Sequence, residues 1–257
     1  MQGEAATDRQ VFRVSGADRV AFLQGLVTND VGRLKQGPVH AALLTPQGKY
    51  LADFFLIGHG DAILLDVRDD LADAVMQRLA LYRLRADVAI APAGLHVQRG
   101  LGPAPEGAVA DPRHPALGWR LYSAQPGGPA AIDWDALRVA HCIPETGQEL
   151  IPGETFILEA GFERLNGVDH RKGCYVGQEV TARMKHKTEL RKGLAVVDVV
   201  SGQAVSGSEI VNAEGKAAGR LHTVSGKRAI AYLRLDRAGH GMTAGQAVLD
   251  WDGTLPG

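Results

Sequence analysis

Beyond Glu189 the chain contains only short strand-like runs separated by glycine turns, and this pattern restricts its C-terminal part to an all-β architecture. The runs cover residues 194–200, 208–211, 215–223, 227–235 and 246–251. Several closely spaced strands of this length are typical of a small barrel or sandwich. We therefore expect residues 189–257 to form a separate C-terminal β-barrel.

The preceding residues mix helical and strand periodicity. A cap-like start at residues 15–18 and apolar residues at helical spacing predict a helix over residues 17–28. Apolar runs at residues 41–45, 50–57 and 62–67, separated by turns, predict a three-stranded meander. A second helix follows Asp69 and Asp70, and its predicted apolar stripe consists of Leu71, Val75, Leu79 and Tyr82. This order of elements predicts a mixed α and β body before the barrel.

Composition and charge narrow the function classes. The chain has 257 residues, of which 45% are hydrophobic and 22% charged, so disorder and coiled coil are excluded. Because the formal net charge is -1, we expect no nucleic-acid partner. No apolar run approaches the ~20 residues that cross a bilayer, and we expect no membrane partner. The two cysteines cannot build a disulfide framework, so we expect a reducing, cytoplasmic location.

The segment best suited to chemistry is residues 172–179, with the sequence Lys172-Gly173-Cys174-Tyr175-Val176-Gly177-Gln178-Glu179. A cysteine reacts as its thiolate, which nearby cations, solvent access and a helix N-terminus favour. Lys172 lies two residues from Cys174, and Gly173 lets the backbone turn without covering the sulfur. Val180 and Met184 are at helical spacing, which predicts a helix that begins just after Cys174.

The same residues also fit a structural interpretation. A single cysteine is commonly a small buried hydrophobe, and the glycines can be turn formers. Gln178 and Glu179 can be first-turn residues that balance the helix dipole. Without further information, Cys174 is therefore either a reactive thiol or a packed side chain.

Four further segments accompany this motif: residues 22–31 (FLQGLVTNDV), 44–49 (LTPQGK), 158–161 (LEAG) and 219–221 with 233–234 (GRL and LR). Together they closely resemble the YgfZ-type folate-binding proteins and their mitochondrial iron–sulfur assembly relatives. The resemblance spans nearly the whole chain. The same superfamily includes the aminomethyltransferase T-protein of glycine cleavage, which binds tetrahydrofolate in a central cavity.

The resemblance implies an α+β fold in which two interwoven α+β lobes, over residues 1–188, surround a folate-sized cavity, with the β-barrel over residues 189–257. It implies that tetrahydrofolate is bound and that the chain supports assembly or repair of four-iron, four-sulfur proteins. The motif cysteine of the family falls on Cys174, which we expect to be the functional thiol. The residues expected to support it are Lys172, Gly173, Tyr175, Gly177, Gln178, Glu179 and Arg183.

Two carboxylates, Asp53 and Glu159, are the expected folate contacts. The acidic pair of the aminomethyltransferase segment falls on residues 52 and 53, where Ala52 replaces one acid and Asp53 remains. Because neighbours on a strand face opposite sides, Asp53 is either a cavity residue or a solvated strand residue. Glu159 resembles a carboxylate that contacts the pterin, whose adjacent N–H donors suit a two-oxygen acceptor, and the alternative is a surface glutamate.

Other polar clusters point to weaker hypotheses. A basic run is suited to a polyglutamate tail, an acidic partner or solvent alone, and it consists of Arg183, Lys185, Lys187, Arg191 and Lys192. His141, His170 and His186 lie near the cysteines without zinc-ligand spacing, so we expect no metal site. A stably owned iron–sulfur cluster normally needs four cysteines, and this chain has Cys142, expected to be structural, and Cys174.

Three functions therefore compete. The leading hypothesis is an iron–sulfur assembly or repair factor in which tetrahydrofolate and Cys174 act together, with client enzymes or assembly scaffold proteins as partners. In this hypothesis Cys174 can lend one thiolate to a cluster whose other ligands come from a partner or a small thiol. The enzyme alternative is a folate-dependent one-carbon transferase that uses Asp53 or Glu159. The third is a folate-responsive adaptor with no catalytic thiol.

Overall fold

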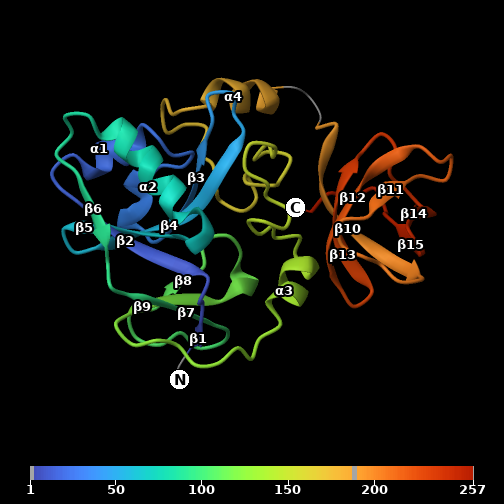
Figure 1. Ribbon diagram of the computed structural model, residues 1–257, viewed down its shortest axis with the longest axis horizontal. Coiled ribbons are helices and arrows are strands. Elements are labelled where there is room, and N and C mark those ends of the chain that lie inside the picture. The colour runs from blue at the N-terminus through green and yellow to red at the C-terminus, as the bar shows by residue number, and fades with distance from the viewer. Residues whose placement is uncertain (1–2, 187–189, 257) are drawn as a thin grey trace. The chain divides into compact units, whose positions relative to one another are not determined.

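The computed structural model describes residues 3–186 and 190–256, and the chain divides into two compact units (Figure 1). Unit 1 consists of Met1–Ile132 and Glu163–Glu179, and unit 2 of Asp133–Phe162 and Val180–Gly257. The boundary expected between residues 188 and 189 lies outside the described residues, so the proposed domain limits stay a prediction. Within the described ranges, no helix combines the length and apolar character needed to span a membrane.

Unit 1 contains two antiparallel sheets. The larger has the order β3-β4-β5-β2-β6, built from β3 (Val39–Leu44), β4 (Tyr50–His59), β5 (Ala62–Arg68), β2 (Arg9–Ser15) and β6 (Ala89–Pro92). The smaller has the order β1-β7-β9-β8, built from β1 (Glu4–Ala5), β7 (His96–Gly100), β9 (Trp119–Ser123) and β8 (Val109–Ala110). Strands β3, β4 and β5 form the predicted meander, which is confirmed.

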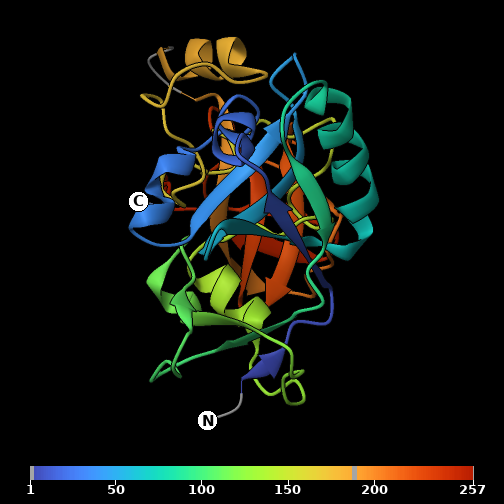
Figure 2. The same cartoon turned by 90° about the vertical axis from the view of Figure 1, so that its left-hand side faces the viewer.

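The helices of unit 1 are α1 (Arg19–Gln24) and α2 (Asp69–Arg83), with 3₁₀ turns at η1 (Val31–Lys35) and η2 (Pro115–Leu117). Helix α2 lies beside the larger sheet (Figure 2), because Ala72, Val75 and Leu79 share a core with residues of β2, β4 and β5. The opposite face of that sheet packs Val11 and Phe55 with Val97 of the smaller sheet. Alternate residues of one strand thus serve two cores.

Two expectations about these helices are wrong. Helix α1 ends at Gln24 instead of residue 28, because Val27 bridges to Leu43 and the Thr28 N–H donates to the Ala42 carbonyl. The strand pairing therefore replaces the last helical turn. On α2, Tyr82 was expected on the buried stripe but lies exposed.

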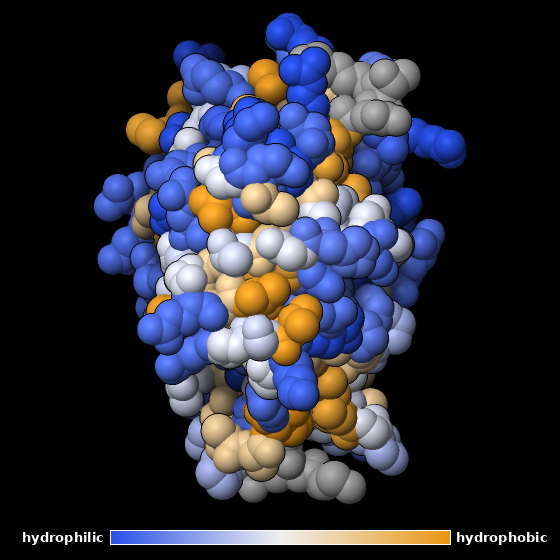
Figure 3. Space-filling view, turned by 90° about the vertical axis from the view of Figure 1, so that its right-hand side faces the viewer, coloured by the Kyte–Doolittle hydropathy of each residue, from blue (hydrophilic) through white to orange (hydrophobic). Residues whose placement is uncertain are grey.

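Unit 2 carries the C-terminal barrel, which confirms the strand-only prediction. Its closed order is β10-β13-β12-β11-β14-β15, with β10 (Lys192–Ser201), β11 (Glu209–Val211), β12 (Ala217–Ser225), β13 (Arg228–Arg234), β14 (Met242–Ala244) and β15 (Ala247–Asp250). Strand β14 was not predicted because three residues between glycines give no readable alternation. Figure 3 shows mainly hydrophilic groups with smaller apolar patches on the barrel side.

Two helices complete the description. Helix α3 (Trp134–Ala140) begins where the Asp133 side chain accepts from the Ala136 N–H at 2.9 Å. It contacts the barrel through Arg138, which donates to Thr223 of β12 and pairs with Glu149. Helix α4 (Gln178–His186) follows the cysteine motif and contains the division between the two units.

Candidate functional site

Cys174 lies exposed in a loop of unit 1 whose start is fixed by a reciprocal set of hydrogen bonds. The Lys172 ammonium donates to the carbonyl oxygens of Gln24 and Val27, at the end of α1. In return, Gln24 Nε2 donates to the Lys172 carbonyl at 3.1 Å, and its Oε1 accepts from the Val31 N–H at 2.8 Å. Lys172 therefore satisfies carbonyls that a helix end leaves open, and it ties the loop to them.

The charge of Lys172 is held in a partly desolvated place. Burial lowers the pKa of Lys172 to about 8, although Asp30 and Asp169 act in the opposite direction. The ammonium also lies 5.0 Å from the centre of the Tyr175 ring, which is buried. Lys172, the cation expected to support Cys174, therefore directs its N–H donors at backbone oxygens.

The two glycines of the motif have different roles. Gly177 has a φ of +84°, and a Cβ there would lie 2.6 Å from the Thr45 carbonyl oxygen and 3.2 Å from Gly48 Cα. Only glycine allows this approach, so the motif packs directly on the turn of residues 44–49. Gly173 has a φ of +98° but meets nothing within 4 Å, so it supplies the turn alone.

Residues 166–169, which precede the loop, are hydrogen-bonded to Thr28 and Asn29 after the end of α1. The Thr28 hydroxyl donates to the Gly167 carbonyl at 2.6 Å, and the Asp169 N–H donates to the Thr28 carbonyl at 3.0 Å. Asn29 donates to the Asn166 carbonyl at 2.6 Å. Three segments far apart in the sequence, 24–29, 44–49 and 166–177, therefore converge beside Cys174.

The remaining motif residues follow directly. Gln178 and Glu179 form the first turn of α4, as the sequence predicted, and the Gln178 N–H donates to the Tyr175 carbonyl. Cys142 is fully buried with a φ of +50°, in keeping with its expected structural role. The two thiols therefore differ sharply in access, and Cys174 is the accessible one.

Asp53 lies inside unit 1, so the interpretation as a solvated strand residue is wrong. Its Oδ1 accepts from the Tyr50 hydroxyl at 2.7 Å, and its Oδ2 lies 3.1 Å from His40 Nε2. Burial raises the pKa of Asp53, but the hydrogen bond and charge of His40 and the hydrogen bond from Tyr50 outweigh it and hold the pKa well below its ordinary value. Both carboxylate oxygens are thus committed within the protein.

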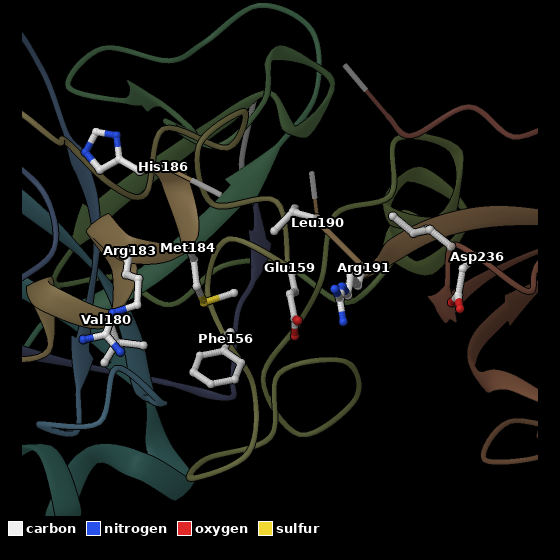
Figure 4. Close-up of a pocket in the computed structure, with 10 residues that line it drawn as sticks. Phe156, Glu159, Val180, Arg183, Met184, His186, Leu190, Arg191 and Asp236 are labelled. Atoms are coloured by element: carbon white, nitrogen blue, oxygen red, sulfur yellow. The ribbon is translucent and has the colours of Figure 1, made fainter. Parts of the chain in front are cut away.

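Glu159 lines a cavity of about 1010 Å³ in unit 2, together with residues of α4 and residues that lie just before β10 and just after β13. Figure 4 shows Phe156, Met184 and Glu159 around one space, with Arg183 on α4 and Arg191 before β10. Glu159 Oε2 accepts from the Tyr232 hydroxyl at 2.7 Å, and burial and this contact raise the pKa of Tyr232. Glu159 is therefore a half-buried cavity residue instead of a surface glutamate.

The predicted site residues thus separate into two groups. Unit 1 holds Asp53 and the cysteine loop, whereas Glu159 and Arg183 line the cavity of unit 2. Of the basic run, Arg183 and Arg191 line this cavity, and Lys187 lies outside the described residues. Within residues 3–186 and 190–256, no group of three or more His, Cys, Asp or Glu side chains is placed to hold a metal ion.

Sequence reasoning missed the role of Gln24, whose side-chain amide donates to the Lys172 carbonyl while its backbone carbonyl accepts from the Lys172 ammonium. The only available signal was its position in the segment FLQG, since a partly buried glutamine has no periodic signature. It also missed the ion-pair cluster between the two sheets of unit 1. There Asp66 binds Arg9 at 2.6 Å and Arg120 at 2.9 Å, with Phe55 beneath the guanidinium groups.

Comparison with known proteins gives consistent matches. Residues 191–253 match the family model described as the CAF17 C-terminal β-barrel domain. The chain is 32% identical to the human protein named iron–sulfur cluster assembly factor IBA57, mitochondrial, over 88% of this chain and 75% of that protein. The mouse protein of the same name is also 32% identical, with the same coverage of 88% and 75%.

The fold is also found in a solved structure. The glycine cleavage system aminomethyltransferase T of Bartonella henselae superposes with a TM-score of 0.74, at 13% identity, over 95% of this chain and 82% of that one. This likeness confirms the expected α+β class with a C-terminal barrel. The expectation of a cytoplasmic location is contradicted, because the human and mouse relatives are named mitochondrial.

Proposed function

Since the chain belongs to the IBA57 family of iron–sulfur cluster assembly factors, we propose that it binds tetrahydrofolate and supports maturation of four-iron, four-sulfur enzymes through Cys174. The family membership confirms the resemblance drawn from the motifs. Its partners in this proposal are iron–sulfur client enzymes or the scaffold proteins that assemble their clusters.

The observation that carries the proposal is the setting of Cys174. The thiol is exposed, yet the loop before it is tied to the end of α1 by Lys172 and Gln24, and Gly177 anchors the loop after it on the 44–49 turn. An exposed cysteine on a loop fixed at both ends can meet a large partner without first paying the entropy of ordering that loop. A merely structural cysteine needs no such exposure.

Cluster chemistry at this position needs a partner. Once the thiol has lost its proton, the sulfur of Cys174 can occupy one coordination position on an iron atom. The cluster is cargo in this proposal, and its other ligands come from the partner or from a small thiol. Lys172, two residues away in the sequence, holds the start of this loop by donating to the carbonyl oxygens of Gln24 and Val27.

The donor set of the unit 2 cavity fits a folate. The Glu159 carboxylate can accept from the adjacent N–H groups of a pterin, and Phe156 offers an aromatic face. Arg183 and Arg191 can pair with the glutamate carboxylates at the other end of the molecule. A cavity of about 1010 Å³ reaches the upper end of the size range of small-molecule sites. When bound, tetrahydrofolate would serve as a carrier of one-carbon units.

The first experiment tests the thiol in cells that lack the protein. Wild type restores aconitase-type activity, and Cys174→Ala is expected to restore less than about a tenth of it, because the cluster loses its protein ligand. Cys142→Ala is the matched control, since it removes the buried thiol and is expected to restore normal activity. Normal restoration by Cys174→Ala would show that the thiol is not functional.

The second experiment separates folate binding from thiol chemistry. Calorimetric titration of tetrahydrofolate is run on wild type, Cys174→Ala and Glu159→Gln, and iodoacetamide labelling of Cys174 is timed with and without ligand. Binding in the first two proteins, with weaker binding in Glu159→Gln, is the expected result. Absence of binding in wild type would remove folate from the proposal, and slow alkylation together with normal complementation would favour an inert adaptor.

A further inference from the structure

The C-terminal end of α2 exposes apolar side chains that the fold does not use. Residues 80–85 are all exposed, and Leu81 and Leu84 keep 72% and 88% of their surface in contact with solvent. Earlier on the same helix, Val75 and Leu79 are buried in the core. Single exposed leucines are ordinary, but two of them beside exposed Tyr82 within one turn form a patch of the kind that marks interaction sites.

The backbone at Leu84 is a second, independent observation. Leu84 has a φ of +42° and a ψ of −107°, a conformation that glycine adopts freely and leucine does not. Helices commonly place glycine or asparagine at such an end. A glycine here would make the fold more stable, and a polar residue would make the protein more soluble. Neither stability nor solubility therefore explains an exposed leucine. Strained residues of this kind cluster at functional positions.

The charge around the patch indicates what it binds. Residues 74–86 contain Arg78, Arg83 and Arg85 and no acidic residue, although the whole chain has a net charge of only -1. Arg83 and Arg85 are exposed on either side of Leu84. An apolar patch flanked by cations is complementary to a segment that carries both acidic and apolar side chains.

A lipid surface fits this patch less well. Helices that lie in a membrane interface present an apolar face along their whole length. Here the apolar residues of the earlier turns, Ala72, Val75 and Leu79, pack into the core of unit 1. Only one turn of α2 is left for contact, which suits a short segment of a protein.

We propose that residues 80–85 are a docking surface for an acidic, apolar-bearing segment of the iron–sulfur protein that this chain serves. The inference rests on the proposed function, since it takes the partner from it. Leu81 and Leu84 provide the apolar contact, and Arg83 and Arg85 select for the acidic partner. The surface does not overlap the residues that hold the Cys174 loop or line the unit 2 cavity.

The test uses three variants of the full chain in cells that lack the protein. Leu84→Gly is expected to raise the melting temperature, because it relieves the backbone conformation, and to restore at least fivefold less aconitase-type activity than wild type. Arg83→Glu combined with Arg85→Glu is expected to lose activity to a similar extent. Val200→Ser removes an apolar side chain that is 59% exposed on the barrel, and as the matched control it is expected to restore normal activity.

Two readouts show that the loss arises at the surface. Iodoacetamide labelling of Cys174 and tetrahydrofolate affinity are expected to equal wild type in all three variants. A photo-reactive phenylalanine in place of Tyr82 is expected to cross-link, in cells, to an iron–sulfur or cluster-assembly protein identified by mass spectrometry, with an acidic segment at the linked site. Cross-linking to lipid or to a second copy of the chain would overturn the inference.

The two proposals fail in different ways. If Cys174→Ala abolishes restoration and Leu84→Gly does not, the docking surface is wrong and the proposed function stands. If Cys174→Ala restores normal activity, the proposed function itself is wrong. If the leucine variant fails and the double arginine variant restores normal activity, the partner is not acidic and the inference is overturned.

Discussion

The interior around β4 in unit 1 and the cavity of unit 2 each contain a carboxylate, and the two carboxylates have opposite surroundings. Asp53 has both oxygens committed to Tyr50 and His40 and is almost without solvent contact. Glu159 shares one oxygen with Tyr232 and lines a cavity. Both residues were expected to contact folate, and the difference points to different tasks: Asp53 ties β3 to β4, whereas Glu159 lines the cavity that we propose binds folate.

The contrast also bears on the competing transferase function. A carboxylate that assists transfer at a folate nitrogen needs an oxygen directed at the ligand. Asp53 has its two oxygens bound within the protein, and its partner position is Ala52. The arrangement therefore gives no support to Asp53 as the transfer residue.

The largest effect is expected from removing the committed carboxylate. Asp53→Ala leaves the Tyr50 hydroxyl and His40 without their acceptor in a buried place, which costs about 3–5 kcal/mol of unfolding free energy. Urea denaturation measures this loss. Asp61→Ala is the matched control, because Asp61 is exposed and its ion pair with Arg13 is worth less than about 1 kcal/mol. Equal losses in the two variants would break the comparison.

The next largest loss of stability is expected in the loop of Cys174, whose backbone at Gly177 packs against the backbone of residues 44–49. Gly177→Ala is expected to lose about 2–3 kcal/mol, because it adds a backbone collision at 2.6 Å to an unfavourable φ. Gly173→Ala is the control with the same type of φ and open space, and about 1–2 kcal/mol is expected. If both variants unfold at the same urea concentration, the packing on Thr45 contributes nothing.

Sequence patterns predicted those features that depend on neighbouring residues. The meander, α2 and a barrel of short strands all follow from local periodicity and turn chemistry. The limits of α1 did not, because Val27 and Thr28 join β3 through contacts distant in the sequence. The hydrogen bonds of Asp53 could not be predicted either. Alternation along a strand distinguishes its two faces, but it does not show which side chains lie on each face.

The site was predicted in outline by its motifs and not in its construction. The motifs located Cys174 and Glu159, but the convergence of segments 24–29, 44–49 and 166–177 is a property of the folded chain. Gln24 shows the limit most clearly, because its partner Lys172 is 148 residues away. No window of local sequence contains both.

The burial of the Lys172 ammonium in unit 1 predicts that the free energy of unfolding depends on pH. Its pKa is about 8 in the folded protein against 10.5 as the ordinary value. Because the unfolded chain holds the proton more tightly, stability rises with pH between about 8 and 10.5, by at most about 1.4 kcal/mol per pH unit. Urea midpoints at pH 7.5 to 10 measure the slope. Lys172→Met is expected to remove this rise, and an unchanged slope would place the titration elsewhere.

The smallest effect on stability is expected at the cavity. Glu159→Gln keeps an oxygen that accepts from the Tyr232 hydroxyl, so the free energy of unfolding should change by less than about 1 kcal/mol. Because the charge facing a pterin is lost, tetrahydrofolate affinity should fall about tenfold, which corresponds to about 1.4 kcal/mol. Calorimetry and urea denaturation on the same preparation separate the two quantities. A loss of stability comparable to that of Asp53→Ala would mean that Glu159 is as structural as Asp53, and the division of tasks between the two carboxylates would be wrong.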